Sequence, residues 1–135
     1  MFDFSKFSDV GDYLSLKNCE ENNRSSISGY YYSVFGSVRM YLVLFLNEFE
    51  FIDNFRVHSR ICDRMSNSDD NTESEIGEIL DDLREIRNYA DYEWDKFDED
   101  YFKKNLVKVR NNSKLALDEV ESLKNHLHLN FSYFF

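Results

Sequence analysis

The segment that decides the fold is residues 25–49, which read SSISGYYYSVFGSVRMYLVLFLNEF. Its apolar residues recur at spacings of three, four and one, which is the pattern of a helix with a buried stripe. Further apolar side chains occupy its other faces, and a helix that is apolar nearly all round is buried on several sides. We therefore expect a helix that forms the centre of a bundle or also faces a second subunit. The stripe consists of Ile27, Tyr31, Val34, Phe35, Val38, Leu42, Phe45, Leu46 and Phe49, and the other faces carry Tyr30, Tyr32, Met40, Tyr41 and Leu44.

One helix is expected on each side of this segment. The earlier one runs from residue 8 or 9 to about residue 21, with Asp9 as its N-cap, and residues 20–23 read as a polar turn. The later, shorter one lies within residues 53–65. Apolar residues at helical spacing should face the core. They are Val10, Tyr13, Leu14 and Cys19 in the first helix and Phe55, Ile61, Cys62 and Met65 in the second.

Two longer helices follow a polar loop at residues 66–71. Thr72 and Glu75 form a capping box, a Thr with a Glu three residues later, which predicts a helix start. A turn at residues 92–97 ends this helix, and Asp98 caps the last one. The expected stripes are Ile76, Leu80, Leu83, Ile86 and Ala90 in the one helix, and Phe102, Leu106, Val109, Ala116, Leu117, Val120, Leu123 and Leu127 in the other.

The composition agrees with a helical chain. It has no proline and four glycines, and 42% of its 135 residues are apolar. A chain without helix breakers that can bury this much apolar surface favours one helical domain. The expected fold class is all-α, an antiparallel bundle of four main helices with one or two short extra helices. Residues 1–135 form this domain, with an N-terminal extension at 1–7 and an apolar tail at 131–135 that packs either on the bundle or on a partner.

The charge and the apolar runs limit the function classes. A net charge of −10 disfavours wide electrostatic binding to nucleic acid, but it permits a small basic site and suits a basic partner. The N-terminus lacks a signal pattern, and the longest apolar run, residues 40–46, is too short to span a bilayer. We expect a cytoplasmic protein with no membrane contact. Nucleotide, dinucleotide, zinc-protease and serine-hydrolase motifs do not occur, so neither a cofactor nor a metal is expected.

A polar cluster, Arg87-Asn88-Tyr89-Ala90-Asp91-Tyr92, ends the helix that begins near Thr72. Arg87 and Asp91 are four residues apart and share one helical face. This cluster is the best candidate for a site in the sequence. The plainer interpretation is an ordinary ion pair worth about 0.3–0.5 kcal/mol. Tyr31 and Tyr32 are expected to pack in the core or an interface, and His58 is expected on the surface of a loop or helix.

Three parts of the chain, in order, resemble a HEPN domain. Ser28, Tyr31, Tyr32 and Phe35 are similar to the family's Ser-x-x-Tyr-Tyr-x-x-Phe helix. His58 lies where many members carry a histidine between basic residues. The segment from Leu83 to Tyr92 resembles the subgroup whose signature ends in Arg-x-x-Ala-Asp-Tyr. The resemblance covers roughly residues 13–123.

The resemblance implies a homodimer in which two copies of the motif line one cleft, and a toxin or phage-defence protein that cuts RNA without a metal. It implies catalytic roles for Arg87, Asp91 and Tyr92, and RNA or phosphate binding by Arg84, Arg87 and Asn88. Two departures stand out. Gly29 and Gly36 replace a basic residue and a histidine, and the places four to six residues after the motif arginine lack the usual histidine.

Two other interpretations stay open. The first is a catalytically silent HEPN module that partners a nucleotidyltransferase antitoxin or another defence protein, with Tyr92 as the residue that the nucleotidyltransferase modifies. The second is a purely structural helical dimer. Because an unperturbed aspartate such as Asp91 is a poor base at neutral pH, the sequence favours a phosphate-facing site over an efficient nuclease.

Overall fold

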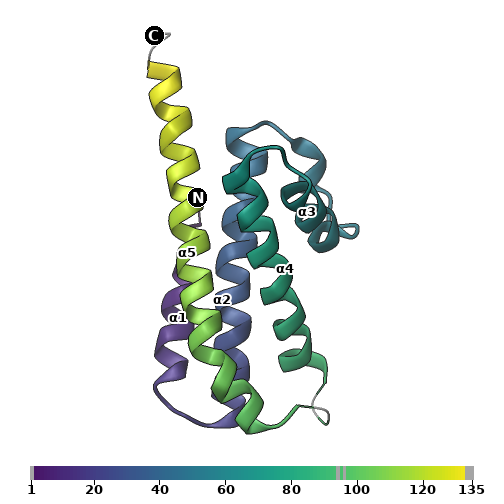
Figure 1. Cartoon of the computed structure of the whole chain (residues 1–135), viewed down its shortest axis with the longest axis vertical. Coiled ribbons are helices and arrows are strands. Elements are labelled where there is room, and N and C mark those ends of the chain that lie inside the picture. The colour runs from purple at the N-terminus through teal and green to yellow at the C-terminus, as the bar shows by residue number, and fades with distance from the viewer. Residues whose placement is uncertain (1, 94, 96, 133–135) are drawn as a thin grey trace.

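The computed structural model describes residues 2–93, 95 and 97–132, with side chains up to residue 127. These residues form an all-α bundle, which confirms the expected fold class (Figure 1). The α-helices are α1 (Lys6–Ser15), α2 (Glu20–Met40), α3 (Val57–Ser66), α4 (Asn71–Tyr92) and α5 (Glu99–Ser132). Two short elements lie between α2 and α3, the π-helix η1 (Tyr41–Phe45) and the 3-10 helix η2 (Phe49–Ile52).

α2 is the central helix, as its apolar circumference predicts. It contacts α1, α4 and α5, and more weakly α3. α4 runs antiparallel to α2 and α5, while α2 and α5 point the same way, and the C-terminal end of α5 stands clear of the other helices (Figure 1). The fully buried side chains of α2 include Ile27, Tyr30, Tyr31, Val34 and Val38. None of the helices within the described residues has the length and apolarity needed to cross a membrane.

Both ends of α2 differ from the prediction. The helix begins at Glu20, so residues 20–23 form its first turn and not a separate polar turn. Acidic side chains in a first turn interact favourably with the helix dipole. At the other end the helix widens into η1, where Leu46 N donates to Tyr41 O at 3.2 Å, and Asn47 then adopts a φ of 58°. The chain therefore leaves the helix before Phe49, whose side chain is exposed.

The predicted inner face of the first helix is wrong. α1 buries Ser8 and Gly11, whereas Val10 and Tyr13 are exposed, and Ser5 replaces Asp9 at the N-cap. The reason is the close approach of α1 to α2. A Cβ on Gly11 would lie 2.8 Å from Cε1 of Tyr30, so small residues face α2 and large ones are turned outward.

The closeness of α1 also explains Gly29, because a Cβ there would lie 3.1 Å from the carbonyl oxygen of Phe7. Gly36 is covered by the side chain of Phe4. A Cβ on this glycine would lie 2.7 Å from the Cβ of Phe4. Gly29 and Gly36 are therefore packing positions in this chain.

α4 begins earlier than the predicted capping box. Asp70 is the N-cap, and its Oδ1 accepts a hydrogen bond from Glu73 N at 2.9 Å. Glu73 turns inward and is 6% exposed. Its carboxylate accepts hydrogen bonds from Tyr41 Oη at 2.6 Å, Ser68 Oγ at 2.7 Å and Arg64 Nη1 at 2.9 Å. The apolar stripe of α4 is buried as predicted, at Ile76, Leu80, Leu83, Ile86 and Ala90.

α3 docks tightly on the start of α4. It buries Val57, Ile61, Cys62 and Met65. The predicted inward position of Phe55 is wrong, because this residue precedes the helix and is 68% exposed. The contact with α4 passes over Gly77. A Cβ there would lie 2.7 Å from the Met65 carbonyl carbon and 2.8 Å from Ser66 Cα, so the backbones touch.

The last helix agrees with the prediction where it is described. Asp98 accepts a hydrogen bond from Tyr101 N at 3.0 Å and caps α5. Phe102, Val109, Ala116 and Val120 are buried, and the remaining predicted stripe residues are partly buried. The side chains of residues 131–135 lie outside the described residues, so the packing of the apolar tail stays a prediction.

Glu119 on α5 makes stability depend on pH. Burial, and then the neighbouring carboxylate of Glu75, raise the pKa of Glu119 to about 7. A hydrogen bond between the two carboxyl groups, which needs a proton on one of them, contributes to this rise. The folded state binds the proton more tightly than the unfolded chain, so stability should fall as the pH rises from about 4.5 to about 7. Urea unfolding across this range should show the decline, and Glu119→Gln should remove it. An equal decline in both proteins would contradict the assignment.

Candidate functional site

Arg87 lies at the centre of an aromatic cage formed by α2 and α4. Its Cζ is 5.4, 5.0 and 5.3 Å from the ring centroids of Tyr31, Tyr32 and Tyr92. Nη2 donates to Tyr32 Oη at 2.5 Å and reaches Tyr92 Oη at 3.5 Å, and Nη1 donates to Asn88 Oδ1 at 3.2 Å. The guanidinium group is therefore fixed in one orientation.

The predicted pair of Arg87 and Asp91 is present, and it is more than a surface ion pair. Arg87 Nε lies 2.8 Å from Asp91 Oδ2, and the two side chains are 12% and 26% exposed. The buried Nε–H of Arg87 does not point at Asp91 Oδ2, so the contact is an ion pair without an aligned hydrogen bond. Asp91 Oδ2 also accepts a weak hydrogen bond from Ser28 Oγ at 3.4 Å. Asp91 thus orients Arg87, and it is poorly placed to act as a free base.

His58, expected on the surface of a loop or helix, lies on α3 and joins this cluster with part of its ring still exposed. It is half-buried in the first turn of α3, with Nδ1 2.5 Å from Tyr31 Oη. Its ring stacks on Phe35 at 4.0 Å between centroids and meets Tyr32 edge-on at 6.1 Å. A histidine from another helix therefore lies in the same cluster as Arg87.

The surroundings of His58 favour its neutral form. Burial lowers the pKa of His58, and the charges of Arg87, Arg84 and Arg39 lower it further. Burial also raises the pKa of Tyr31, so its hydroxyl keeps its proton. Nε2 of His58 has no hydrogen-bond partner among the described side chains. This nitrogen is not fully buried, so it reaches solvent. His58 can therefore accept a proton at Nε2 near neutral pH.

The other predicted phosphate ligands lie on the adjoining face of α4. Arg84 and Asn88 line a shallow polar groove of about 360 Å³ together with Asp81 and Glu85. Because Asn88 accepts a hydrogen bond from Arg87, this groove adjoins the aromatic cage. The thiol of Cys62 faces Arg84, and burial raises the pKa of that thiol to about 11, so it stays protonated.

The tyrosines have a larger part in the site than the sequence suggested. Tyr31 is fully buried and Tyr32 half-buried, which agrees with the expected packing role. Their hydroxyls, however, bind His58 and Arg87. Tyr92, the last residue of α4, is 66% exposed. The predicted site residues Arg84, Arg87, Asn88, Asp91 and Tyr92 are therefore brought together, and the sequence analysis missed Tyr31, Tyr32 and His58.

A second groove, of about 760 Å³, is lined by η2, α3 and the loop before α4, and it shares no lining residue with this cluster. Its arginines are already engaged. Arg60 binds backbone carbonyls, and Arg64 binds Glu48 and Glu73. Within the part of the chain that is described, no three His, Cys, Asp or Glu side chains are placed to hold a metal ion. The Arg87–His58 cluster, meaning Arg87, Asn88, Asp91, Tyr92, Tyr31, Tyr32 and His58, is the candidate site.

Comparisons with protein-family models, with curated proteins and with solved structures give no match. The relation to HEPN proteins thus stays a proposal that rests on the motif residues.

Proposed function

We propose that this chain is a HEPN-like protein that binds RNA and cleaves it without a metal ion at the Arg87–His58 cluster. One observation carries the proposal. An arginine fixed in orientation by Tyr32 and Asp91 lies in the same cluster as a neutral histidine that has one ring nitrogen open to solvent. A cation for the phosphate and a group for proton transfer are the two main requirements of such cleavage.

The proposed reaction begins with attack of the RNA 2′-OH on the adjacent phosphorus. His58 Nε2 takes the 2′-OH proton while Nδ1–H donates to Tyr31 Oη, which a hydroxyl can accept. The bond from phosphorus to O5′ breaks, and Tyr92 gives its hydroxyl proton to the leaving oxygen. The products are a 2′,3′-cyclic phosphate and a 5′-OH, and solvent restores both protein groups.

The remaining residues bind and orient the RNA. The Arg87 fork stabilises the charge that develops on the phosphate oxygens. Asp91 holds Arg87 in position, and Arg84 and Asn88 contact the neighbouring phosphate from the groove on α4. With a net charge of −10, the chain contacts RNA over this small area only. The proposed biological setting is a toxin–antitoxin or phage-defence system in which two copies of the chain pair.

Substitution of Arg87 tests the proposal directly. Arg87→Ala should lower cleavage of tRNA and mRNA by about 10²- to 10³-fold, the usual cost of losing a donor to a developing oxyanion. Arg87→Lys should recover only part of this, since an ammonium lacks the bidentate fork. Mapping of the product ends should find cyclic phosphates. Arg110→Ala, on the exposed side of α5, is the matched control and should cleave like the wild type.

The proposal fails if the purified protein leaves both RNAs intact, or if Arg87→Ala cleaves as fast as the wild type. Products that end in a 3′-OH would also contradict attack by the 2′-OH.

The exposure of Tyr92 favours a second candidate function, a silent subunit that a nucleotidyltransferase modifies. Its hydroxyl is open to solvent and lies beside the positive charge of Arg87, which suits an incoming nucleotide phosphate. Mass spectrometry of protein co-expressed with a nucleotidyltransferase should show added nucleotide on the wild type and none on Tyr92→Phe. An unmodified wild type rules out this candidate.

A further inference from the structure

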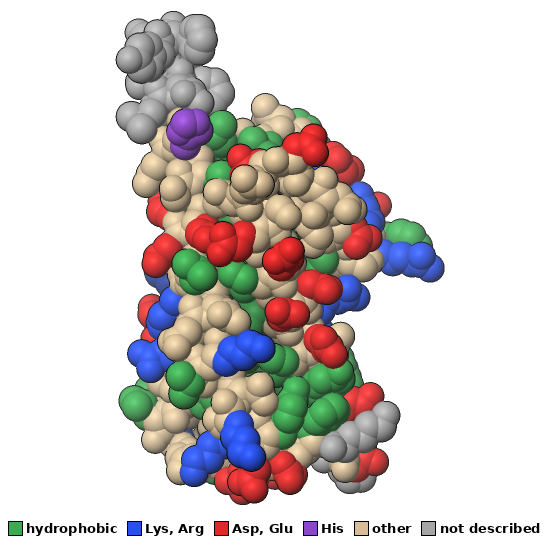
Figure 2. Space-filling model, in the orientation of Figure 1, with side chains coloured by type: hydrophobic (Ala, Val, Ile, Leu, Met, Phe, Trp, Pro, Cys, Tyr) green, Lys and Arg blue, Asp and Glu red, His purple; other side chains and the backbone are tan. Residues whose placement is uncertain are grey.

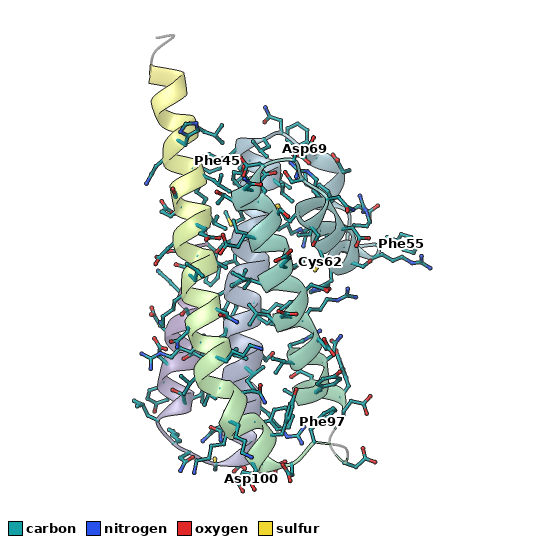
Figure 3. The ribbon with its side chains drawn as sticks, viewed as in Figure 1. Phe45, Phe55, Cys62, Asp69, Phe97 and Asp100 are labelled. Carbon is teal, nitrogen blue, oxygen red and sulfur yellow. The ribbon has the colours of Figure 1, made fainter. Side chains whose placement is uncertain are left out.

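η2 and the loop that leads from it into α3, together residues 49–56, present apolar side chains to solvent. Phe49, Ile52 and Phe55 are 59%, 58% and 68% exposed. Phe55 points away from the bundle at the outer end of the loop (Figure 3). On the space-filling surface, hydrophobic and basic atoms project together from this edge (Figure 2). Exposed apolar groups that gather in this way mark interaction sites.

Two arginines hold this exposed loop in one conformation. Arg39 donates to the carbonyl oxygens of Phe51 and Ile52, both at 2.8 Å. Arg60 donates to the carbonyl oxygens of Phe55 at 3.2 Å and Glu50 at 2.9 Å. A loop that is ordered before it meets its ligand loses less entropy on binding. The fixed backbone therefore serves to present Phe55, since Phe55 itself adds nothing to the core.

Arg56 places a cation next to this ring. It adopts the left-handed conformation, with a φ of 50°, and its Cζ lies 5.2 Å from the Phe55 ring centroid. For a residue with a Cβ this left-handed conformation is unfavourable. The same residue is the N-cap of α3, so His58 follows within the first turn of that helix. The exposed ring, its cation and the proton-transfer histidine thus lie within four consecutive residues.

We propose that Phe55 and Arg56 form a stacking platform for one base of a single-stranded RNA whose backbone enters the Arg87–His58 cluster. This inference rests on the proposed function and specifies its substrate as single-stranded. An exposed aromatic ring stacks on any base, and a neighbouring arginine strengthens the contact with the base or its phosphate.

Arginines close to the cluster support an RNA occupant. Residues 18–95 carry 17 Asp and Glu residues against seven arginines, so attraction for RNA must come from these few arginines, which bind phosphate through a planar fork. The charges of Arg39, Arg84 and Arg87 each lower the pKa of His58, which places these three cations near its ring. A second copy of the chain, by contrast, would contact the apolar side chains of the loop and would not need the neighbouring arginines.

Binding of a short 2′-O-methyl oligoadenylate tests the platform, because this RNA lacks the nucleophile and stays intact. Phe55→Ala and Phe55→Leu should weaken binding about 5- to 150-fold, the usual effect of losing one stacked base, whereas Phe55→Trp should bind like the wild type. Phe49→Ala is the matched control, an exposed ring of the adjoining η2, and should not change the affinity. Circular dichroism of each variant should confirm that it is folded.

Several results would overturn the platform. The first is a Phe55→Leu variant that binds RNA as tightly as the wild type, and the second is an abasic oligonucleotide that binds as well as the adenylate. The third is that Phe49→Ala and Phe55→Ala each dissociate a dimer without changing the affinity for RNA. The last result would assign the loop to self-association.

Failure of the platform and failure of the nuclease are distinguishable. If the wild type binds the oligoadenylate through Phe55 and cleaves no RNA, the platform stands and the proposed reaction does not. If the wild type cleaves RNA and Phe55→Ala leaves both KM and kcat unchanged, the platform alone is wrong. When both are right, Phe55→Ala raises KM and leaves kcat near its wild-type value.

Discussion

Replacing His58 with alanine is expected to lower the rate of RNA cleavage by about 10²- to 10⁴-fold, the usual contribution of a positioned general base. The affinity for RNA should change little, because Arg87, Arg84 and Asn88 remain to bind phosphate. Single-turnover cleavage separates the two quantities. His126→Ala, an exposed histidine on α5, is the matched control and should cleave like the wild type.

The pH profile gives a second readout for His58. A general base must be unprotonated, so the rate should fall in acid as His58 takes up a proton. Burial and the nearby arginines hold the pKa of His58 below its ordinary value of 6.5, so the fall should begin below that pH. Tyr31→Phe should shift this limb, since it removes the hydrogen-bond partner of Nδ1. A profile whose acidic limb survives in His58→Ala would show that another group is the base.

The largest effect on stability is expected from Glu73→Ala. Breaking a buried ion pair by removing one partner costs about 3–5 kcal/mol, and we expect the lower end because Arg64 keeps Glu48 at 2.7 Å. The change also leaves the hydroxyl of Tyr41 without its acceptor in the core. Guanidinium chloride unfolding at neutral pH measures the loss. Glu78→Ala, an exposed carboxylate on α4, should stay within about 0.5 kcal/mol of the wild type.

The charge on Glu73 adds a check by pH. Burial opposes ionisation of Glu73, but hydrogen bonds from Tyr41, Ser68 and Arg64 outweigh it and keep its pKa below the ordinary value. The stability that Glu73 contributes should therefore be present at neutral pH and be lost in acid, as the pH falls through the lowered pKa. If Glu73→Ala unfolds at the same denaturant concentration as Glu78→Ala, the network contributes nothing to stability.

Periodicity predicted the buried faces better than the ends of the helices. The stripe of α4 from Ile76 to Ala90 is buried throughout, because a 3.6-residue repeat over many turns leaves only one face of the helix that can point to the core. The ends depend on single side chains, and Asp70 caps α4 in place of Thr72. The buried face of α1 was also predicted wrongly, because only a residue without a side chain, Gly11, lets this helix approach Tyr30. Such choices are made by tertiary contacts that a local pattern does not contain.

The candidate site was likewise predictable only in part. Arg87 and Asp91 are one helical turn apart, so their pairing follows from the sequence. His58 and Tyr31 are 27 residues apart, and only the docking of α3 brings them together. A search for a histidine after Arg87 looks along α4, whereas the histidine reaches the site from another helix. The spacing of Ser28, Tyr31, Tyr32 and Phe35 on one face was the available sign that α2 lines a site.

The bare backbone contact at Gly77 has a geometric consequence for this divided site. His58 and Arg87, the two groups proposed to act on RNA, belong to separate helices, α3 and α4, and Arg87 lies ten residues beyond Gly77, roughly 15 Å along the helix axis. Since the backbones meet at Gly77, the two helices are as close as they can be, and any side chain there must push α3 outward as a body. The absence of a side chain at Gly77 therefore helps to set the distance between His58 and Arg87, although Gly77 itself touches neither residue.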